Sequence, residues 1–240
     1  MNPEKNAQRF SWPRKSRKDF LWCSCGGAVN HTTTMNKTRY FLSVFKKAKK
    51  KFGNADIRLA AEGWKEGWQV LIATIMSAQS RDTTTIPIAE MLFAKYNSLE
   101  KLAGANYKDV LKIFKSLNYN KTKAKNVIGA AKYVINNFYG KLPDKMEDLV
   151  KIPGVGRKTA NIVLFAVHKK PAIAVDTHVH RISNVLGLVK TKTPEQTEQE
   201  LMKIIPKKYW TEVNYIFVRW GQATPGRDKG KLLMKINYPI

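Results

Sequence analysis

The sequence predicts an all-α protein, and three observations support this fold class. From about residue 38 onward, apolar residues recur at the three- and four-residue spacing of a helix face. Glycine, proline and capping residues stand where these segments should begin or end. No stretch combines sustained alternation with many β-branched residues; the run "KPAIAVD" at 170–176 resembles a short strand, but isolated strands are rarely stable. We therefore expect about ten helices and no sheet.

The first five helices are expected between residues 38 and 140. The first, 38–53, stops at Gly53, a natural C-terminal signal. The second, 67–80, is apolar on most faces, which is typical of a helix in the centre of a domain. The next three are amphipathic, and the last of them ends at Gly140; they are expected over 86–96, 107–117 and 123–140.

The remaining helices carry clearer start signals. Asp176 is placed to cap one of them, because an aspartate side chain accepts hydrogen bonds from the first amides of a helix. Thr193 is the expected N-cap of the next, with Pro194 at its first position and Gln196 completing a capping box. These helices are expected over 146–152, 158–168, 177–187, 193–205 and 209–221.

The composition points to a polyanionic partner. The 240 residues include 43 Lys and Arg against 18 Asp and Glu, a formal net charge of +25, which far exceeds what solubility requires. Nucleic acid and an acidic membrane surface both fit such an excess. No apolar run reaches the ~18 residues of a membrane span, and the first residues lack the apolar core of a secretory signal. We therefore expect an intracellular protein whose leading partner is nucleic acid, without a membrane.

Residues 1–37 are expected to form a basic, irregular arm. They are polar, broken by proline and glycine, and show no sustained periodicity. The run "PRKSRKD" suits a localisation signal, a nucleic-acid-binding arm or merely a solvated tail. Cys23 and Cys25 are too close together for an ordinary structural disulfide, which fits a reducing compartment.

The stretch "IPGVGRKTANIVL" at 152–164 places a tight turn and two cations between apolar segments. Gly154 and Gly156 permit unusual backbone angles and leave their amides unshielded. Together with the positive end of the next helix and with Arg157, these amides predict an anion site that suits a DNA phosphate without base preference. The alternative is a plain connection between two helices.

Lys158 and Asp176 are candidate catalytic residues. A helix N-terminus and the neighbouring Arg157 both disfavour a charged lysine, and a neutral amine is a nucleophile that forms Schiff bases. Asp176 follows an apolar run at a helix start, where it serves as a cap, as a general base or as the partner of a cation forming nearby. Taken alone, Lys158 also fits an ordinary surface lysine.

The motifs "LVKIPGVGRKTANIVL" (149–164) and "AIAVDTHVHRISNVLG" (172–187) resemble the signature of the endonuclease III family of DNA glycosylases, in the helix-hairpin-helix superfamily. "LIATIMSAQSRD" (71–82) and "LNYNKTKAKNV" (117–127) resemble that family's helix before the first DNA-probing loop and its second such loop. The resemblance spans about 60–188 with consistent spacing.

This resemblance implies a bifunctional base-excision-repair enzyme, a DNA glycosylase with AP lyase activity. Lys158 would attack C1′ of the damaged nucleotide, and Asp176 would help to deprotonate it and stabilise the sugar cation. β-Elimination from the Schiff base would then cut the strand. The implied partner is double-stranded DNA with a damaged base, by default an oxidised pyrimidine, or with an abasic site. A monomer is expected, in the cytoplasm with the nucleoid, or in a nucleus or organelle if the source is eukaryotic.

The resemblance also implies DNA-binding residues. Gln79 matches the residue that fills the space left by the flipped base, and Tyr119 matches a wedge, often leucine, that probes the opposite strand. An aromatic wedge can still stack on bases. The structural alternatives are a polar residue at a helix end for Gln79 and a half-buried loop aromatic for Tyr119. The hairpin set comprises Gly154, Gly156, Arg157 and Thr159.

One departure from the family is large. Most members hold a [4Fe–4S] cluster with four C-terminal cysteines spaced C-x6-C-x2-C-x5-C, whereas residues 221–240 contain no cysteine. The Cys23–Cys25 pair supplies too few ligands, and His178 and His180 should point to different faces of a helix. We therefore expect no metal and no cofactor. The residues expected to order this segment by packing onto the domain are Leu232, Leu233, Ile236 and Tyr238, with Lys229, Lys231 and Lys235 facing phosphate.

The implied architecture has two helical lobes with a DNA-binding cleft. Residues 60–170 would form a six-helix barrel that carries the helix-hairpin-helix, and residues 38–59 plus 171–240 a second lobe. Two alternatives remain: a mismatch or uracil DNA glycosylase of the same superfamily, and a non-catalytic helix-hairpin-helix protein that only binds DNA.

Overall fold

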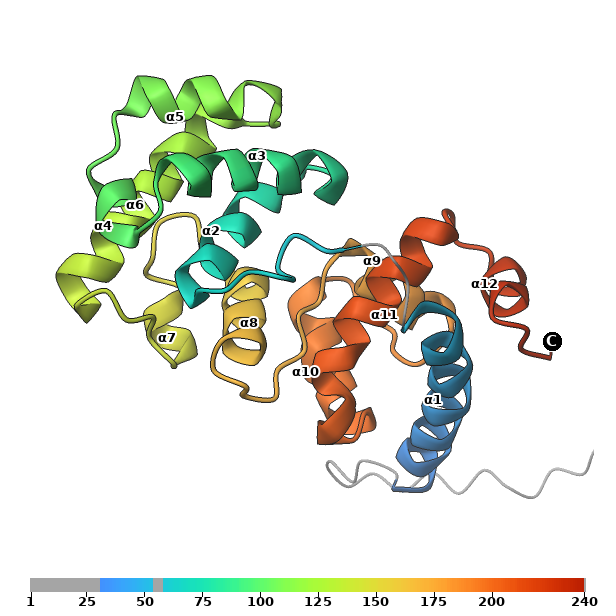
Figure 1. Cartoon of the computed structure of the whole chain (residues 1–240). Coiled ribbons are helices and arrows are strands. Elements are labelled where there is room, and N and C mark those ends of the chain that lie inside the picture. Colours follow the sequence, from blue (N-terminus) through green and yellow to red (C-terminus); the bar gives the residue numbers. More distant parts are fainter. Residues whose placement is uncertain (1–30, 54–57, 240) are drawn as a thin grey trace, which may run out of the picture. The chain divides into compact units, whose positions relative to one another are not determined.

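The computed structural model describes residues 31–53 and 58–239, and every regular element within them is helical. The expected all-α class is thus confirmed. Figure 1 shows helices α1 (His31–Phe52), α2 (Gly67–Ser77), α3 (Asp82–Lys95), α4 (Leu99–Ala103), α5 (Tyr107–Ile113), α6 (Asn120–Phe138), α7 (Met146–Leu149), α8 (Arg157–Ala166), α9 (Thr177–Val185), α10 (Pro194–Ile204), α11 (Trp210–Ala223) and α12 (Lys229–Lys235). Two 3₁₀ turns, Phe114–Ser116 and Lys207–Tyr209, complete the described chain.

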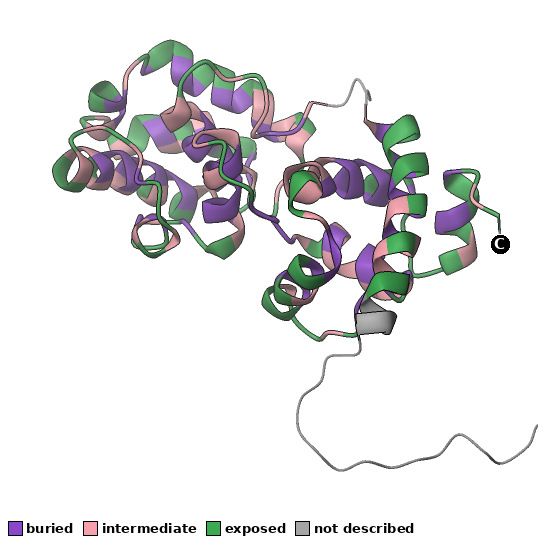
Figure 2. Cartoon of the chain, turned by 90° about the horizontal axis from the view of Figure 1, so that it is seen from below, coloured by how far each residue is buried: buried purple, intermediate pink, exposed green. Residues whose placement is uncertain are grey.

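Two hydrophobic cores organise these helices. The first core lies among α2–α8, where α2 packs on α3, α6 and α8 and is buried along most of its length. The second core joins α1 to α9–α12 and includes the fully buried Phe41, Phe217 and Trp220. Figure 2 shows the buried positions along the inward sides of both groups of helices. The expectation of a central apolar helix at 67–80 is confirmed by α2, which ends at Ser77.

The two cores meet at a small apolar cluster around an irregular segment. Ala172 and Ala174, in the run that resembled a strand, pack with Val70, Ile162 and Phe165 and form no sheet. Instead, buried amide side chains bind the carbonyl oxygens of this segment: Asn161 Nδ2 lies 3.1 Å from Ile173 O, and Asn214 Nδ2 lies 2.8 Å from Ala174 O. The backbone of residues 170–176 is therefore fixed by side chains from α8 and α11.

The start signals of α9 and α10 act as expected. The Asp176 carboxylate accepts a hydrogen bond from the Val179 amide at 2.8 Å. Thr193 and Gln196 form the capping box of α10, and Pro194 occupies its first position. Both caps satisfy amides that a helix leaves without internal partners.

Some boundaries differ from the sequence expectations. α1 begins at His31, so residues 31–37 of the expected irregular arm are helical, while residues 1–30, with Cys23 and Cys25, lie outside the described chain. α4 was not expected, because five residues are too few to show a helical period. α3 begins at Asp82 rather than at residue 86.

The C-terminal segment packs back onto the second core, as expected. α12 is capped by Asp228, and Leu232, Leu233 and Ile236 are buried. The next turn is held to α1: the Tyr238 hydroxyl lies 2.9 Å from Ser43 Oγ, and Lys47 donates to the Asn237 carbonyl at 2.7 Å. The helix itself had not been expected.

Lys123 is a buried lysine in α6, with only 4% of its surface exposed. Its ammonium donates to Ser80 Oγ at 2.8 Å. Burial in this poorly solvated position lowers the pKa of Lys123 to about 8. The charged form is therefore costly in the folded protein at neutral pH.

This burial predicts a pH-dependent stability. Below pH 8, Lys123 is protonated in both states and its desolvation penalty opposes folding. Between pH 8 and about 10.5, the Lys123 amine loses its proton in the folded state but keeps it in the unfolded state. The free energy of unfolding therefore rises with pH, by up to about 3 kcal/mol. K123M has no amine to titrate, so its free energy of unfolding should not show this rise. The difference in free energy of unfolding between K123M and the wild type should therefore change by up to about 3 kcal/mol in favour of the wild type between pH 8 and about 10.5. Chemical denaturation at each pH measures the free energy of unfolding, and K125M, at the exposed Lys125, is the matched control. Parallel curves of unfolding free energy against pH for K123M and the wild type would contradict the prediction.

Candidate active site

A cavity of about 690 Å³ opens where the two cores meet, a size typical of small-ligand sites. Its walls come from the loop before α2, the end of α2 and the turn after it, the start of α3, α8, the start of α9 and one face of α11. Asn118 before α6 and Pro194 at the start of α10 complete the lining. Lys158 and Asp176, which the family resemblance implied as catalytic residues, and Gln79, which it implied as a DNA-binding residue, all line it.

Asp176 is held at the cavity by its backbone and by its cap. The preceding residues, 172–175, are buried, and the side chain caps α9 through Oδ1. The carboxylate is half-buried. Because the segment and the helix are both fixed, the acid has little freedom to move away from the cavity.

Lys158 reaches the same cavity from the first turn of α8. It is half-buried and stands two residues after Gly156, the N-cap of that helix. The structure therefore brings the amine and the acid, which are 18 positions apart in the sequence, to one site from two different helices.

Asp82, at the first position of α3, is a further charged residue of the cavity that the sequence analysis does not identify. Burial raises the pKa of its carboxyl group, which the positive charge of Lys158 opposes and the negative charge of Asp176 reinforces. The charges of Lys158 and Asp176 are therefore close enough to Asp82 to affect its protonation. The signal was present in "SAQSRD", where an aspartate follows a turn at a helix start.

The hairpin turn, residues 153–156, has the backbone geometry that its glycines suggested. Gly154 has φ of 79°, and a Cβ there would lie 2.9 Å from Asn126 Cβ, so no other residue fits without strain. A Cβ on Gly156 would meet nothing within 4 Å. The hydrogen bonding of α8 starts with Ala160 N to Gly156 O, and the amides before Ala160 belong to the helix N-terminus. Thr159, predicted to bind DNA with this turn, is buried.

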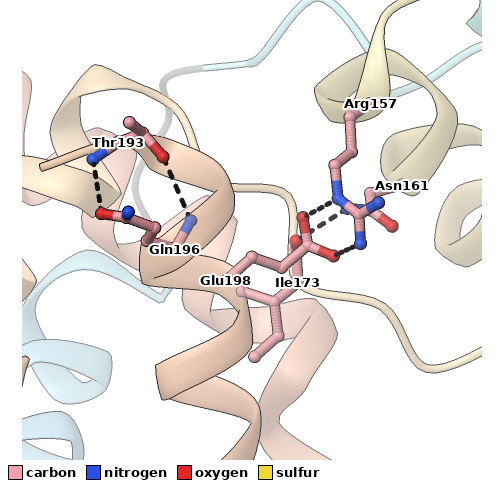
Figure 3. Close-up of polar contacts among 6 residues, drawn as sticks. All are labelled: Arg157, Asn161, Ile173, Thr193, Gln196 and Glu198. Carbon is pink, nitrogen blue, oxygen red and sulfur yellow. Dashed lines mark hydrogen bonds and ion pairs between the residues drawn. The ribbon is translucent and has the colours of Figure 1, made fainter. Parts of the chain in front are cut away.

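Arg157, predicted to add free charge to this turn, is ion-paired in the structure. Its Nε and Nη2 donate to Oε2 and Oε1 of Glu198, both at 2.8 Å (Figure 3). The acid is on α10, and its side chain is 7% exposed. This pair was not visible in the sequence, because its members are 41 residues apart.

The two loops that resembled DNA-probing loops are joined to each other. Gln79 and Tyr119 both have positive φ, at 53° and 56°, which is uncommon for residues other than glycine. Asn118 donates from Nδ2 to the Gln79 carbonyl at 2.7 Å, and Lys123 bonds Ser80 across the same junction. Tyr119 is 66% exposed and Gln79 is also exposed. Tyr119 is not among the cavity residues.

The residues present do not fit an iron–sulfur cluster. The whole sequence contains two cysteines, both near its start, so the four-cysteine set is missing. At the end of α11 and in the turn after it, Arg181 instead donates to the carbonyl oxygens of Gly221, Thr224 and Gly226. Among the described residues, no group of His, Cys, Asp and Glu is arranged to hold a metal ion. His178 lines the cavity whereas His180 Nδ1 lies 2.6 Å from Thr197 Oγ1, so the two point to different sides, as predicted.

Within the described ranges, no helix is long and apolar enough to span a bilayer.

Comparisons with known proteins identify the family. Residues 72–207 match the family model described as HhH-GPD superfamily base excision DNA repair protein. Endonuclease III of Thermotoga maritima is 44% identical over 155 residues, which cover 65% of this chain and 73% of that protein. Endonuclease III of Bacillus subtilis is 35% identical over 156 residues, 65% of this chain and 71% of that protein.

Solved structures of related proteins have the same fold. A trapped endonuclease III–DNA covalent intermediate superposes with a TM-score of 0.73 at 30% identity, covering 79% of this chain and 88% of the other. A thermostable thymine-DNA glycosylase, with a TM-score of 0.69 at 19% identity over 82% of this chain and 92% of that one, shares the fold. The chain therefore belongs to the HhH-GPD superfamily of base excision DNA repair proteins and, within it, to the endonuclease III family.

Proposed function

We propose that this base excision DNA glycosylase and AP lyase acts through Lys158 as the nucleophile and Asp176 as its acid partner. The observation that carries this assignment is the shared cavity, which an amine from α8 and a carboxylate from α9 both line. A nucleophile with a base nearby is the usual arrangement for covalent catalysis.

The proposed reaction proceeds in two stages. The neutral Lys158 amine, after giving a proton to Asp176, attacks C1′; the glycosidic bond breaks, and its electron pair leaves with the base, which takes the proton back from Asp176 and so restores the carboxylate. The attacking nitrogen then passes a proton to O4′ as the bond between C1′ and O4′ breaks, which opens the sugar ring to an iminium between Nζ and C1′. Water removes the C2′ proton; the electron pair of that C–H bond forms the double bond between C2′ and C3′, and the 3′ phosphate leaves with the electrons of the C3′–O bond. Hydrolysis of the iminium releases the lysine. The Asp176 carboxylate stabilises the positive charge that develops on the sugar.

The hairpin turn is proposed to hold the DNA backbone. The amides at the start of α8 and the open space at Gly156 offer a phosphate several donors without a side chain in the way. Such contacts are independent of sequence and fix the register of the duplex. The net charge of +25 favours the same partner.

Gln79 and Tyr119 are proposed to stabilise the flipped state of the DNA. Extruding a nucleotide costs a few kcal/mol of stacking and pairing. Gln79, at the cavity edge, would occupy the space that the base leaves, and the exposed Tyr119 ring would stack on the opposite strand.

We propose double-stranded DNA with an oxidised pyrimidine or an abasic site as substrate, a monomer as the active form, and a location alongside DNA inside the cell. Support for the substrate comes from relatives named endonuclease III and from a related structure trapped covalently on DNA.

The lysine assignment predicts a trappable covalent adduct. Borohydride should reduce the Schiff base of the wild type with lesion-containing DNA, and K158Q should give no adduct while binding the duplex within about threefold of the wild type, because one neutral replacement removes the nucleophile and leaves the phosphate contacts. The exposed Lys203 gives the control K203Q, which should trap normally. Excision without an adduct in the wild type would favour a monofunctional mismatch or uracil glycosylase. Unchanged activity in K158Q would favour a protein that only binds DNA.

The hairpin assignment predicts different effects at its two glycines. G156A adds a methyl group into open space, so its stability should stay within about 1 kcal/mol of the wild type, since N-cap preferences are of that size. Its DNA affinity should fall about tenfold or more, because losing a hydrogen bond to a charged group costs about 1.5 kcal/mol. G154A should instead lower the melting temperature, because of its positive φ and the contact with Asn126. Thermal melts and binding to a duplex measure both; wild-type affinity in G156A would refute the phosphate site.

The substrate assignment predicts preferential cleavage of oxidised pyrimidines. Duplexes that each carry one lesion (an oxidised pyrimidine, uracil, or thymine opposite guanine) should be compared in single-turnover strand cleavage. We expect the oxidised pyrimidine to be cut at least about tenfold faster than the mismatched thymine, the discrimination that 1.4 kcal/mol provides. Faster cleavage of thymine opposite guanine would reassign the enzyme to mismatch repair.

A further inference from the structure

The Arg157–Glu198 ion pair connects the hairpin turn to the other group of helices. Both bonds are 2.8 Å long and run in parallel, the fork geometry that makes arginine–carboxylate pairs specific in direction as well as strong. The carboxylate side is the buried side, at 7% exposed, against 40% for the arginine. Figure 3 shows the two side chains meeting between α8 and α10.

The pair is next to Lys158 in the sequence and is connected to the helix of Asp176 through α10. Arg157 directly precedes Lys158 in the first turn of α8, so fixing its side chain fixes the start of that helix. On α10, Thr197 precedes Glu198 and lies 2.6 Å from His180 Nδ1 of α9, the helix that Asp176 caps. Two side-chain contacts thus connect α8 to α10 and α10 to α9, and the backbone of α10 joins them between Thr197 and Glu198.

A phosphate contact is the alternative role for Arg157, and the geometry disfavours it. Two of its donors are already used, and its charge is balanced by the carboxylate. Turning the guanidinium to DNA would leave Glu198 buried without its partner, which is strongly unfavourable. In the same turn, backbone amides remain for the phosphate.

We propose that Glu198 is a positioning residue that, through Arg157, sets the distance between the Lys158 amine and the Asp176 carboxylate. This inference rests on the proposed roles of Lys158 and Asp176. Errors of about 1 Å in such an arrangement slow reactions about 100-fold without weakening binding. Loss of the pair should therefore lower the rate of the covalent step and leave DNA affinity intact.

The test uses the full chain with excess enzyme on a lesion-containing duplex, and measures the single-turnover rate of adduct formation below the melting temperature. E198Q and R157Q should each slow the reaction by about 10- to 100-fold. The double variant R157Q/E198Q should be no slower than either single one, because both remove the same connection. E200Q is the matched control: Glu200 is on the same helix but forms an exposed pair with Lys203, and its loss should leave the rate unchanged.

The dissociation constant and its salt dependence separate the two roles of Arg157. If Arg157 contacts phosphate, R157Q lowers the slope of log affinity against log salt by about 0.9. If Arg157 only positions the catalytic residues, R157Q should leave the salt slope unchanged. Its DNA affinity should then change less than about threefold, because no contact with DNA is lost; a tenfold change would correspond to about 1.4 kcal/mol. A reduced slope in R157Q with a normal rate in E198Q would overturn the proposal.

R157K covers the case in which E198Q does not fold. It keeps the positive charge on the more exposed partner but replaces the planar fork with a single point of contact, so it should fold and still slow adduct formation. Wild-type rates in R157K, with only a lower melting temperature, would mean that the pair is structural, and would refute the inference. If the wild type itself forms no adduct, the assignment of Lys158 fails instead.

Discussion

The position of residues 171–176 is the constraint on which the site depends. This segment carries Asp176 and has no regular hydrogen-bonded structure of its own. Two buried amide side chains, from Asn161 and Asn214, satisfy its Ile173 and Ala174 carbonyls. Both are in helices that also line the cavity, and unsatisfied buried carbonyls would be costly. The acid is therefore placed by the same two helices, α8 and α11, whose packing forms the cavity wall.

The C-terminal segment shows how the same fold is held without cysteine ligands. Arg181 of α9 gathers three carbonyl oxygens at the end of α11 and in the following turn, and burial lowers the pKa of its guanidinium while leaving it charged. α12 then adds apolar surface to the second core. Charge-assisted hydrogen bonds and hydrophobic burial thus order this segment, and both are available from the residues that the chain contains.

Periodicity and capping residues in the sequence predicted the long helices, because the apolar face of a helix is formed by residues three and four positions apart in the sequence. Thr193 and Gln196 even indicated where α10 begins. The five-residue α4 lacked enough turns to show a period. The pairing of Arg157 with Glu198 could not be foreseen, since it depends on how α8 and α10 pack. The positive φ angles of Gln79 and Tyr119 were equally hidden, because neither residue type demands that conformation.

The joined loops extend the same reasoning to DNA binding. Left-handed backbone angles at Gln79 and Tyr119 cost energy, and such strain persists only where surrounding contacts hold it. Here the contacts are the Asn118 bond to the Gln79 carbonyl and the buried Lys123 bond to Ser80. Because the loops are fixed against each other before DNA arrives, little conformational entropy remains to be lost when the duplex is bound. The bond from the buried Lys123 to Ser80 therefore helps to fix both loops in the free protein: the one that carries Gln79, proposed to fill the space of the flipped base, and the one that carries Tyr119, proposed to stack on the opposite strand.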